Sequence, residues 1–367
     1  MIHGAKGTPA ANRMRDNPGR SSEGFAETAS SPSKDACTLR RWREYARTSQ
    51  TALFSVESSL LLILVMVALI GVFWVLLRDT AFMSVGNFMN IVKAKTPVIV
   101  MAVASVFVIS AGEIDLSIAS VPPVVGTLAA TLLAHGYGMW IAVAAALAVG
   151  LSVGLINGAI TVLIGIPSFI VTLGMIGALE GAARLISGEQ AVPITNEVYT
   201  SNFGSGSLGP VPVLLAWTLG VGVLGTVVLR STPFGKAVLA TGGNEVAARY
   251  SGVRTRRIKV AVLILSGLAG ALAGLLYTGQ LASGRYDLGG GDLLTVLAAV
   301  VIGGTALNGG RGSVEGAIAG ALLVGLVSNG VILLGFSTPQ QQIFSGLIIV
   351  LAVALSGRRL RQLRSLR

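Results

Sequence analysis

The chain alternates between long uncharged stretches and short charged segments. No Asp, Glu, Lys or Arg occurs in six intervals: 58–77, 116–179, 198–229, 260–284, 293–310 and 316–357. A membrane-spanning helix needs about 20 mostly apolar residues, so each interval can hold at least one span. These stretches lack the polar face of a soluble helix and the alternation of a barrel strand. Because only helices then satisfy the backbone in lipid, the pattern predicts an all-α polytopic membrane protein.

Dividing these stretches at Gly, Pro and polar clusters predicts about ten transmembrane helices. They are expected near 58–77, 96–111, 116–134, 139–163, 169–187, 211–229, 259–280, 293–307, 314–334 and 341–356. The second and eighth are short, and short spans interrupted by Gly are where broken helices occur. Whether these two cross completely stays open at this point.

The positions of Lys and Arg predict the orientation of the bundle. They cluster before the first span, in the loop 230–259 and in the tail 358–367. Cytoplasmic segments carry an excess of these residues, and an even number of spans places all three clusters on one side. The longest loop on the other side, 188–211, contains neither Lys nor Arg. We therefore expect both termini in the cytoplasm.

Composition divides the chain into three regions. Residues 1–50 are rich in Ser, Gly, Ala and charge, which predicts a disordered cytoplasmic extension. Residues 51–357 form the expected transmembrane domain, and 358–367 form a basic cytoplasmic tail. The net charge of +11 lies in loops and tails, so it does not indicate a nucleic-acid partner. The single cysteine, Cys37, precludes a disulfide within the chain.

The basic loop 230–259 contains the signals of a short helix. Asn244 is a suitable N-cap, Glu245 favours the first turn, and Gly252 is a natural residue after the helix end. Such a helix has about two turns and is marginal alone, so it must be held by docking. The residues leave two readings open: a helix on the membrane surface, or a helix that inserts into a cytoplasmic motor subunit.

A second group of polar residues lies close to the predicted spans. Glu113 and Asp115 follow the second span and are expected at a solvated cytoplasmic mouth, or deeper and facing a cavity if the second span is broken. They would lie in a structural turn or beside a transport path. Asn157, Phe169 and Thr172 flank the turn between the fourth and fifth spans. They are candidates for lining a sugar path, because sugars pair apolar ring faces with hydrogen-bonding hydroxyls. A helix starting with Pro167 is the structural alternative.

Two ion pairs are expected from helical spacing. Glu180 and Arg184 are four residues apart inside the fifth span, and Arg311 and Glu315 have the same spacing at the start of the ninth.

Five ordered blocks of the sequence resemble the permease subunits of bacterial ABC importers for ribose, xylose, arabinose and related sugars. The blocks are NFMNI (87–91), AGEIDLSIAS (111–120), NGAITVLIGIPSFIVTLGMIGALEGAARLISG (157–188), TPFGKAVLATGGNEVAARYSGV (232–253) and LAAVVIGGTALNGGRGSVEGAIAGALLVGLVSNGVILLGFS (297–337). Glu113 departs from the resemblance, because this family usually has glycine there.

The resemblance implies a permease that forms a homodimer or heterodimer in the bacterial inner membrane. A cytoplasmic ABC ATPase and an extracytoplasmic sugar-binding protein would be its partners, besides membrane lipid. Residues expected to couple to the ATPase are Gly243, Asn244, Glu245, Ala247, Ala248, Arg249, Gly252 and Arg311. Residues expected along the translocation path are Asp115, Ser117, Asn157, Phe169 and Thr172.

The chain is expected to be a transport subunit with no catalytic residues, cofactor or metal of its own. The phosphate-binding pattern GxxxxGK[ST] is absent, since Gly235-Lys236 is followed by Ala237. ATP and Mg²⁺ would therefore be bound by a partner chain. Two alternatives remain: a related permease for nucleosides or branched-chain amino acids, and a secondary transporter driven by an ion gradient. Against the latter, Glu180 is the only acid well inside a predicted span.

Overall fold

The computed structural model describes residues 62–337, 339–341, 343–344 and 346–347. Seven helical segments in this part of the chain are long and apolar enough to cross a membrane. They are Val85–Ser110 (α2), Ser117–Ala134 (η2 and α3), Met139–Ile164 (α4 and η3), Ser168–Ser187 (α5), Val213–Ser231 (α7), Thr255–Leu281 (α10) and Val314–Leu333 (α12). The predicted extension 1–50, the basic tail and most of the last predicted span lie outside the described residues.

Shorter elements connect these helices. The helical ones are Leu62–Leu76, η1 (Ala81–Met83), η2 (Ser117–Ala119), the π-helix η3 (Ile160–Ile164), α6 (Glu197–Phe203), α8 (Pro233–Gly243), α9 (Glu245–Tyr250) and α11 (Asp292–Ile302). Two antiparallel pairs of two-residue strands join β1 (Val192–Pro193) to β4 (Ser283–Gly284) and β2 (Ser207–Leu208) to β3 (Val211–Pro212). Within the longer segments, α3 proper covers Val121–Ala134 and α4 covers Met139–Ala159.

Helix α10 packs against α2, α3 and α4. On one side of it, α3 also contacts α4 and α5; on the other, α2 also contacts α7, α11 and α12. The contact between α4 and α10 depends on glycine, because small residues let transmembrane helices approach closely. A Cβ added to Gly150 would lie 2.4 Å from the carbonyl oxygen of Gly267, and one added to Gly267 would lie 2.1 Å from that of Gly150. The two backbones therefore approach more closely than any side chain allows.

The second predicted span is longer than expected. Helix α2 begins at Val85 rather than near residue 96 and continues through Pro97 to Ser110. The boundary predicted near residue 96 left Lys93 and Lys95 outside the span. In the structure both lie in the helix, half-buried, and the aliphatic stem of Lys95 packs near Gly325 of α12. A lysine whose stem packs on a neighbouring helix is accommodated more easily than one facing lipid.

The eighth predicted span does not form one crossing helix. Helix α11 has 11 residues, about 16 Å at 1.5 Å per residue, or about half of a 30 Å hydrocarbon core. The helix ends at Ile302, and the next residue, Gly303, packs tightly against α12. A Cβ added to Gly303 would lie 2.3 Å from the backbone of Gly316. From Gly303 to Ser313 the chain is not helical. The described residues thus support seven spanning helices and two shorter apolar ones.

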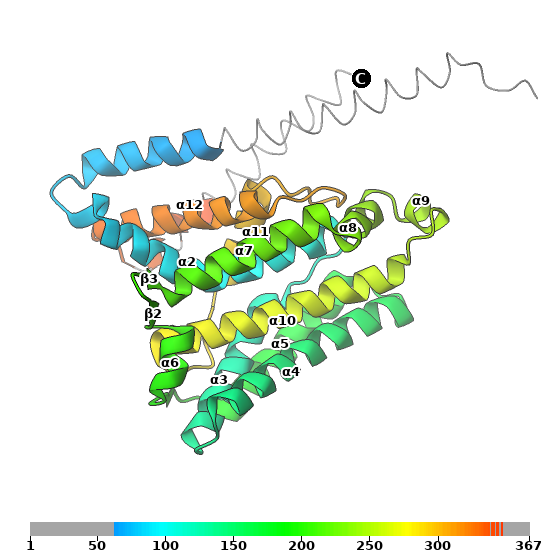
Figure 1. Ribbon diagram of the computed structural model, residues 1–367, viewed down its shortest axis with the longest axis horizontal. Coiled ribbons are helices and arrows are strands. Elements are labelled where there is room, and N and C mark those ends of the chain that lie inside the picture. Colours follow the sequence, from blue (N-terminus) through cyan, green and yellow to red (C-terminus); the bar gives the residue numbers. More distant parts are fainter. Residues whose placement is uncertain (1–61, 338, 342, 345, 348–367) are drawn as a thin grey trace, which may run out of the picture. The chain divides into compact units, whose positions relative to one another are not determined.

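Different connecting segments lie at the two ends of the helices. Helices α8 and α9 and the start of α10 lie at one end, here called the basic end, and α6 lies at the other (Figure 1). At the basic end the amide of Gly310 donates a 2.9 Å hydrogen bond to the carbonyl of Ser110, the last residue of α2. This contact brings the 303–313 segment to the same end as α8 and α9.

Candidate functional site at the basic end

The short helix predicted in the basic loop is confirmed. It is α9, and the Asn244 side-chain oxygen caps it by accepting a 3.0 Å hydrogen bond from the amide of Ala247. Gly252 has φ +85°, the left-handed conformation that favours glycine after a helix end. The sequence prediction missed α8, which precedes it. Thr232 caps α8 by accepting from the amide of Gly235, and Pro233 occupies its first position.

Helix α9 has one buried face and one uncovered face. Ala248 is buried, whereas Val246 is 62% exposed and Tyr250 is 90% exposed. Val246 and Tyr250 are four residues apart, so their side chains share one face of the helix. The sequence analysis missed this pair, although the spacing is readable once the helix is known. An exposed valine and tyrosine side by side are suited to docking a protein partner.

Four charged groups connect α9 to the rest of the basic end. Lys259 of α10 lies 2.8 Å from a carboxylate oxygen of Glu113 and 2.8 Å from one of Glu245. Glu245 also pairs with Arg249 at 3.1 Å and accepts a 3.3 Å hydrogen bond from the hydroxyl of Thr255. The hydrogen bond from Lys259 is the largest effect holding the pKa of Glu245 below its usual value. Glu245 is therefore anchored within this chain.

The expected solvation of Glu113 is wrong. Its residue is only 7% exposed, and its carboxylate is paired with Lys259. The two residues are far apart in the sequence, and Glu113 is brought to α10 by the fold. A buried carboxylate requires such a partner, because burying an unpaired charge is costly.

Both ion pairs expected from helical spacing are also wrong. Glu315 pairs with Arg230 of α7 at 3.0 Å rather than with Arg311. Arg184 pairs with Glu189 at 3.6 Å rather than with Glu180, which is exposed. Helical spacing permits a pair, but another group can take its place: an arginine of a different helix for Glu315, and an acid just beyond the end of α5 for Arg184.

The second loop at the basic end lies against the corner between α8 and α9. A Cβ added to Gly243 would lie 3.7 Å from the Cα atom of Gly310, and one added to Gly310 would lie 2.6 Å from the Cα atom of Gly243. Arg311 follows directly and is exposed. The structure thus brings Arg311 and Gly243, two of the residues predicted to couple to an ATPase, into one region.

Four of the five predicted path residues form a buried polar cluster. Asp115 accepts hydrogen bonds from the amide and the hydroxyl of Ser117 at 2.8 and 2.7 Å. Asn157 of α4 donates to the Ser117 hydroxyl at 3.0 Å. Thr172 of α5 accepts from the amide of Leu116 at 3.0 Å. Burial raises the pKa of the Asp115 carboxyl, and hydrogen bonds to its ionised form offset this only in part.

The fifth predicted path residue, Phe169, is not part of this cluster. Its side chain is 46% exposed on α5, beside Ile170 and Leu173, which are also exposed. Phe169 lies on a face of α5 that no helix in the described part of the chain covers, whereas Thr172 lies on the inner face.

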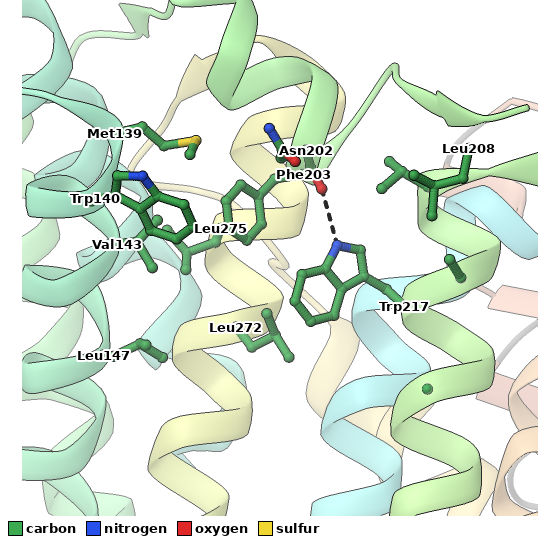
Figure 2. Close-up of a pocket in the computed structure, with 13 residues that line it drawn as sticks. Met139, Trp140, Val143, Leu147, Asn202, Phe203, Leu208, Trp217, Leu272 and Leu275 are labelled. Carbon is green, nitrogen blue, oxygen red and sulfur yellow. Dashed lines mark hydrogen bonds between the residues drawn. The ribbon is translucent and has the colours of Figure 1, made fainter.

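An apolar pocket of about 520 Å³ lies toward the end opposite α9. Figure 2 shows it between α4, α6, α7 and α10, with Trp140 and Trp217 on its walls. The indole nitrogen of Trp217 donates a 3.0 Å hydrogen bond to the backbone carbonyl of Asn202 (Figure 2). The polar cluster around Asp115 contributes no residue to this pocket.

Seven apolar helices of spanning length, packed through glycine, define a multi-pass α-helical membrane protein. The chain belongs to the family described as branched-chain amino acid transport system permease component, which residues 87–353 match. It is therefore a transport subunit of the ABC permease class.

Three similar proteins show how far the likeness extends. The ribose import permease protein RbsC of Escherichia coli K12 is 35% identical over 312 residues, 83% of this chain and 94% of RbsC. The L-arabinose permease AraH of Azospirillum brasilense is 33% identical over 286 residues, 78% and 84% of the two chains. The probable ABC transporter permease YphD of Escherichia coli K12 is 36% identical over 277 residues, 76% and 83%. No solved structure matches the chain significantly.

Proposed function

We propose that this chain is the membrane subunit of an ABC importer for a monosaccharide of the ribose or arabinose kind. The carrying observation is α9, a capped two-turn helix at the basic end whose Val246 and Tyr250 are uncovered. Similar permeases over most of the chain are named for ribose and arabinose import. An importer subunit without a phosphate-binding loop needs an ATPase, and α9 offers a surface for it.

In this proposal the basic end faces the cytoplasm of a bacterial cell, as expected from the excess of Lys and Arg. An ABC ATPase binds there and supplies the ATP and Mg²⁺ sites, and this chain holds no cofactor. Gly243, Asn244, Ala247, Ala248 and Gly252 shape α9 and its corner, and Arg311 lies on the neighbouring loop. A sugar-binding protein docks at the opposite end.

A second permease, identical or related, completes the transporter. The uncovered face of α5 carries Phe169 and Leu173. This surface is proposed either to contact the second permease or to line the translocation path. The cluster of Asp115, Ser117, Asn157 and Thr172 lies behind it and holds α3, α4 and α5 in register. Alternating access would follow from movement of these helices when the ATPases close.

Transport assays test the proposal directly. The permease is co-expressed with an ABC ATPase and a sugar-binding protein from the same genome, and uptake of labelled D-ribose, L-arabinose and L-leucine into proteoliposomes is measured. ATP-dependent uptake of a pentose supports the proposal. Uptake of leucine alone would instead support the amino-acid transport named in the family description, and uptake driven by an ion gradient without ATP would contradict the ABC class.

Docking through α9 is tested separately. Tyr250→Asp places a charge on the uncovered face, so co-purification of the ATPase should be lost while membrane insertion is retained. Tyr137→Asp is the matched control, because Tyr137 is also exposed but precedes α4 at the other end. Equal ATPase recovery from both variants would show that α9 is not the docking helix.

A further inference from the structure

We infer that Lys259, by binding Glu113 and Glu245 at once, transmits movement of α9 to the start of α5. This deepens the proposed function, on which it rests. Lys259 is a positioning residue here: it touches neither sugar nor ATP, and acts by joining the docking helix to the segment from Ala111 to Leu116.

The first link is the shared ammonium group. The Lys259 nitrogen lies 2.8 Å from an oxygen of each carboxylate, and its side chain is 21% exposed. The side chain of Glu113 is 8% exposed. Removing one partner from a largely buried ion pair leaves the other charge buried and unpaired. Because opening the contact is costly, α9 and Glu113 are expected to move together.

The second link runs from Glu113 to α5 through the adjoining backbone. The amide of Ile114 donates a 3.0 Å hydrogen bond to the hydroxyl of Ser168, the first residue of α5. The amide of Leu116 donates a 3.0 Å hydrogen bond to Thr172, one turn further along. A displacement of Glu113 is therefore delivered to the first turn of α5, the helix with the uncovered face.

The third observation is space for movement beside the bridge. A polar cavity of about 280 Å³ is bordered by Glu113, Glu245 and Lys259 and by the turn from Thr161 to Pro167. Arg249 and Arg256 also line it. In the part of the chain that the structure describes, the hydroxyl of Thr161 is buried and has no hydrogen-bond partner. The cavity gives a charged side chain of the bridge room to shift, so α9 can move without disrupting apolar packing.

The test uses the assembled transporter of permease, ATPase and sugar-binding protein. Glu113→Gln removes the carboxylate charge with little change in shape. ATPase co-purification and ATP hydrolysis should persist, while sugar transported per ATP falls. A coupling free energy of ordinary size predicts a decrease between about 5-fold and about 150-fold. Lys259→Arg keeps both carboxylates paired and should retain most of the transport.

The control and a second variant keep the outcomes distinct. Asp79→Asn removes a carboxylate from the exposed pair with Arg78 and should leave transport per ATP unchanged. Should Glu113→Gln not accumulate in the membrane, Glu113→Asp keeps the charge but shortens its reach, and the same decrease is expected.

Unchanged transport per ATP in these Glu113 variants would overturn the inference and leave the proposed function intact. Loss of ATPase binding together with transport would also overturn it, because Glu113 would then act on docking. Failure of the unaltered transporter to link ATP to uptake would instead reject the proposed function.

Discussion

Asn157 donates a 3.0 Å hydrogen bond to the hydroxyl of Ser117, which in turn donates a 2.7 Å hydrogen bond to Asp115. All three residues are buried. Asn157 belongs to α4, Ser117 begins the segment leading to α3, and Asp115 belongs to the connection that follows α2. One chain of side chains thus ties three parts of the bundle together, close to the bridge made by Lys259.

Replacing Asn157 should weaken the bundle measurably. Asn157→Ala removes one buried hydrogen bond, so the free energy of unfolding should fall by about 0.5–1.5 kcal/mol. Thermal unfolding in detergent measures the change. Asn202→Ala is the control, because Asn202 is exposed and its amide donates to a carbonyl of its own helix. Equal destabilisation by both variants would contradict the structural role of Asn157.

The charge of Asp115 should make stability depend on pH. Because burial raises its pKa above the ordinary value of 3.8, the folded protein holds this proton more tightly than the unfolded chain does. The cost of ionisation is absent below the unfolded pKa and fully present above the folded pKa. Asp115→Asn keeps an oxygen acceptor without the charge. Its melting temperature relative to the unaltered protein should therefore increase as the pH rises from the ordinary aspartate pKa of about 4 toward neutral pH.

Asp115→Ala separates hydrogen bonding from charge. It removes the acceptor for both Ser117 hydrogen bonds, so its melting temperature should lie below that of Asp115→Asn at every pH. A constant difference between Asp115→Asn and the unaltered protein across the pH range would show that ionisation of Asp115 carries no cost.

The glycine contact between α4 and α10 should not tolerate a methyl group. Gly267→Ala places a Cβ 2.1 Å from the carbonyl oxygen of Gly150, and overpacking of this kind costs about 1–3 kcal/mol. Gly177→Ala is the control on α5, where nothing lies within 4 Å of the added atom. That variant should be neutral or gain up to about 1 kcal/mol from helix propensity. Thermal unfolding in detergent measures the stability of both variants relative to the unaltered protein.

The cap of α9 should matter for docking. Asn244→Ala loses the hydrogen bond to the amide of Ala247, which costs about 1 kcal/mol of helix stability. With the helix populated less, ATPase recovery at limiting concentration should decrease by about fivefold. Asn244→Ser preserves a capping oxygen and should retain recovery. Identical recovery from the two variants would mean that α9 is held by its tertiary contacts alone.

Features that depend on neighbouring residues were predictable from the sequence. The caps of α9 follow from Asn244 and Gly252, because capping bonds join residues three or four positions apart. The uncharged stretches predicted most of the spanning helices, because each span is satisfied within its own backbone. The spacing of Gly150 and Gly154 allows close helix packing, but it does not identify α10 as the partner of α4. The five ordered blocks were sufficient to indicate the permease family.

Pairing between distant segments was not predictable. The partner of Lys259 could not be found from spacing, because Glu113 reaches it only when α2 and α10 pack together. For the same reason Glu315 pairs with Arg230 of α7 rather than with Arg311. Arg184 pairs with Glu189, which is only five residues away but lies just past the left-handed turn at Gly188 that ends α5. Asp115, Ser117, Asn157 and Thr172 were predicted to lie along a path, but only the structure shows that all four are buried. It also shows that Asp115, Ser117 and Asn157 are hydrogen-bonded in series, while Thr172 bonds the backbone at Leu116.

The sequence by itself therefore determined the class of protein, most of its helices and the short helix α9. Only the tertiary structure decided that α2 begins at Val85, that α11 stops halfway, and that Lys259 joins two carboxylates. Apolar runs and helix caps stabilise structure through contacts between residues that are close in the sequence, so they can be recognised from the sequence alone. Ion pairs between helices, and helix ends that are determined by packing, depend on which helices are neighbours. The packing of the whole bundle determines those neighbours.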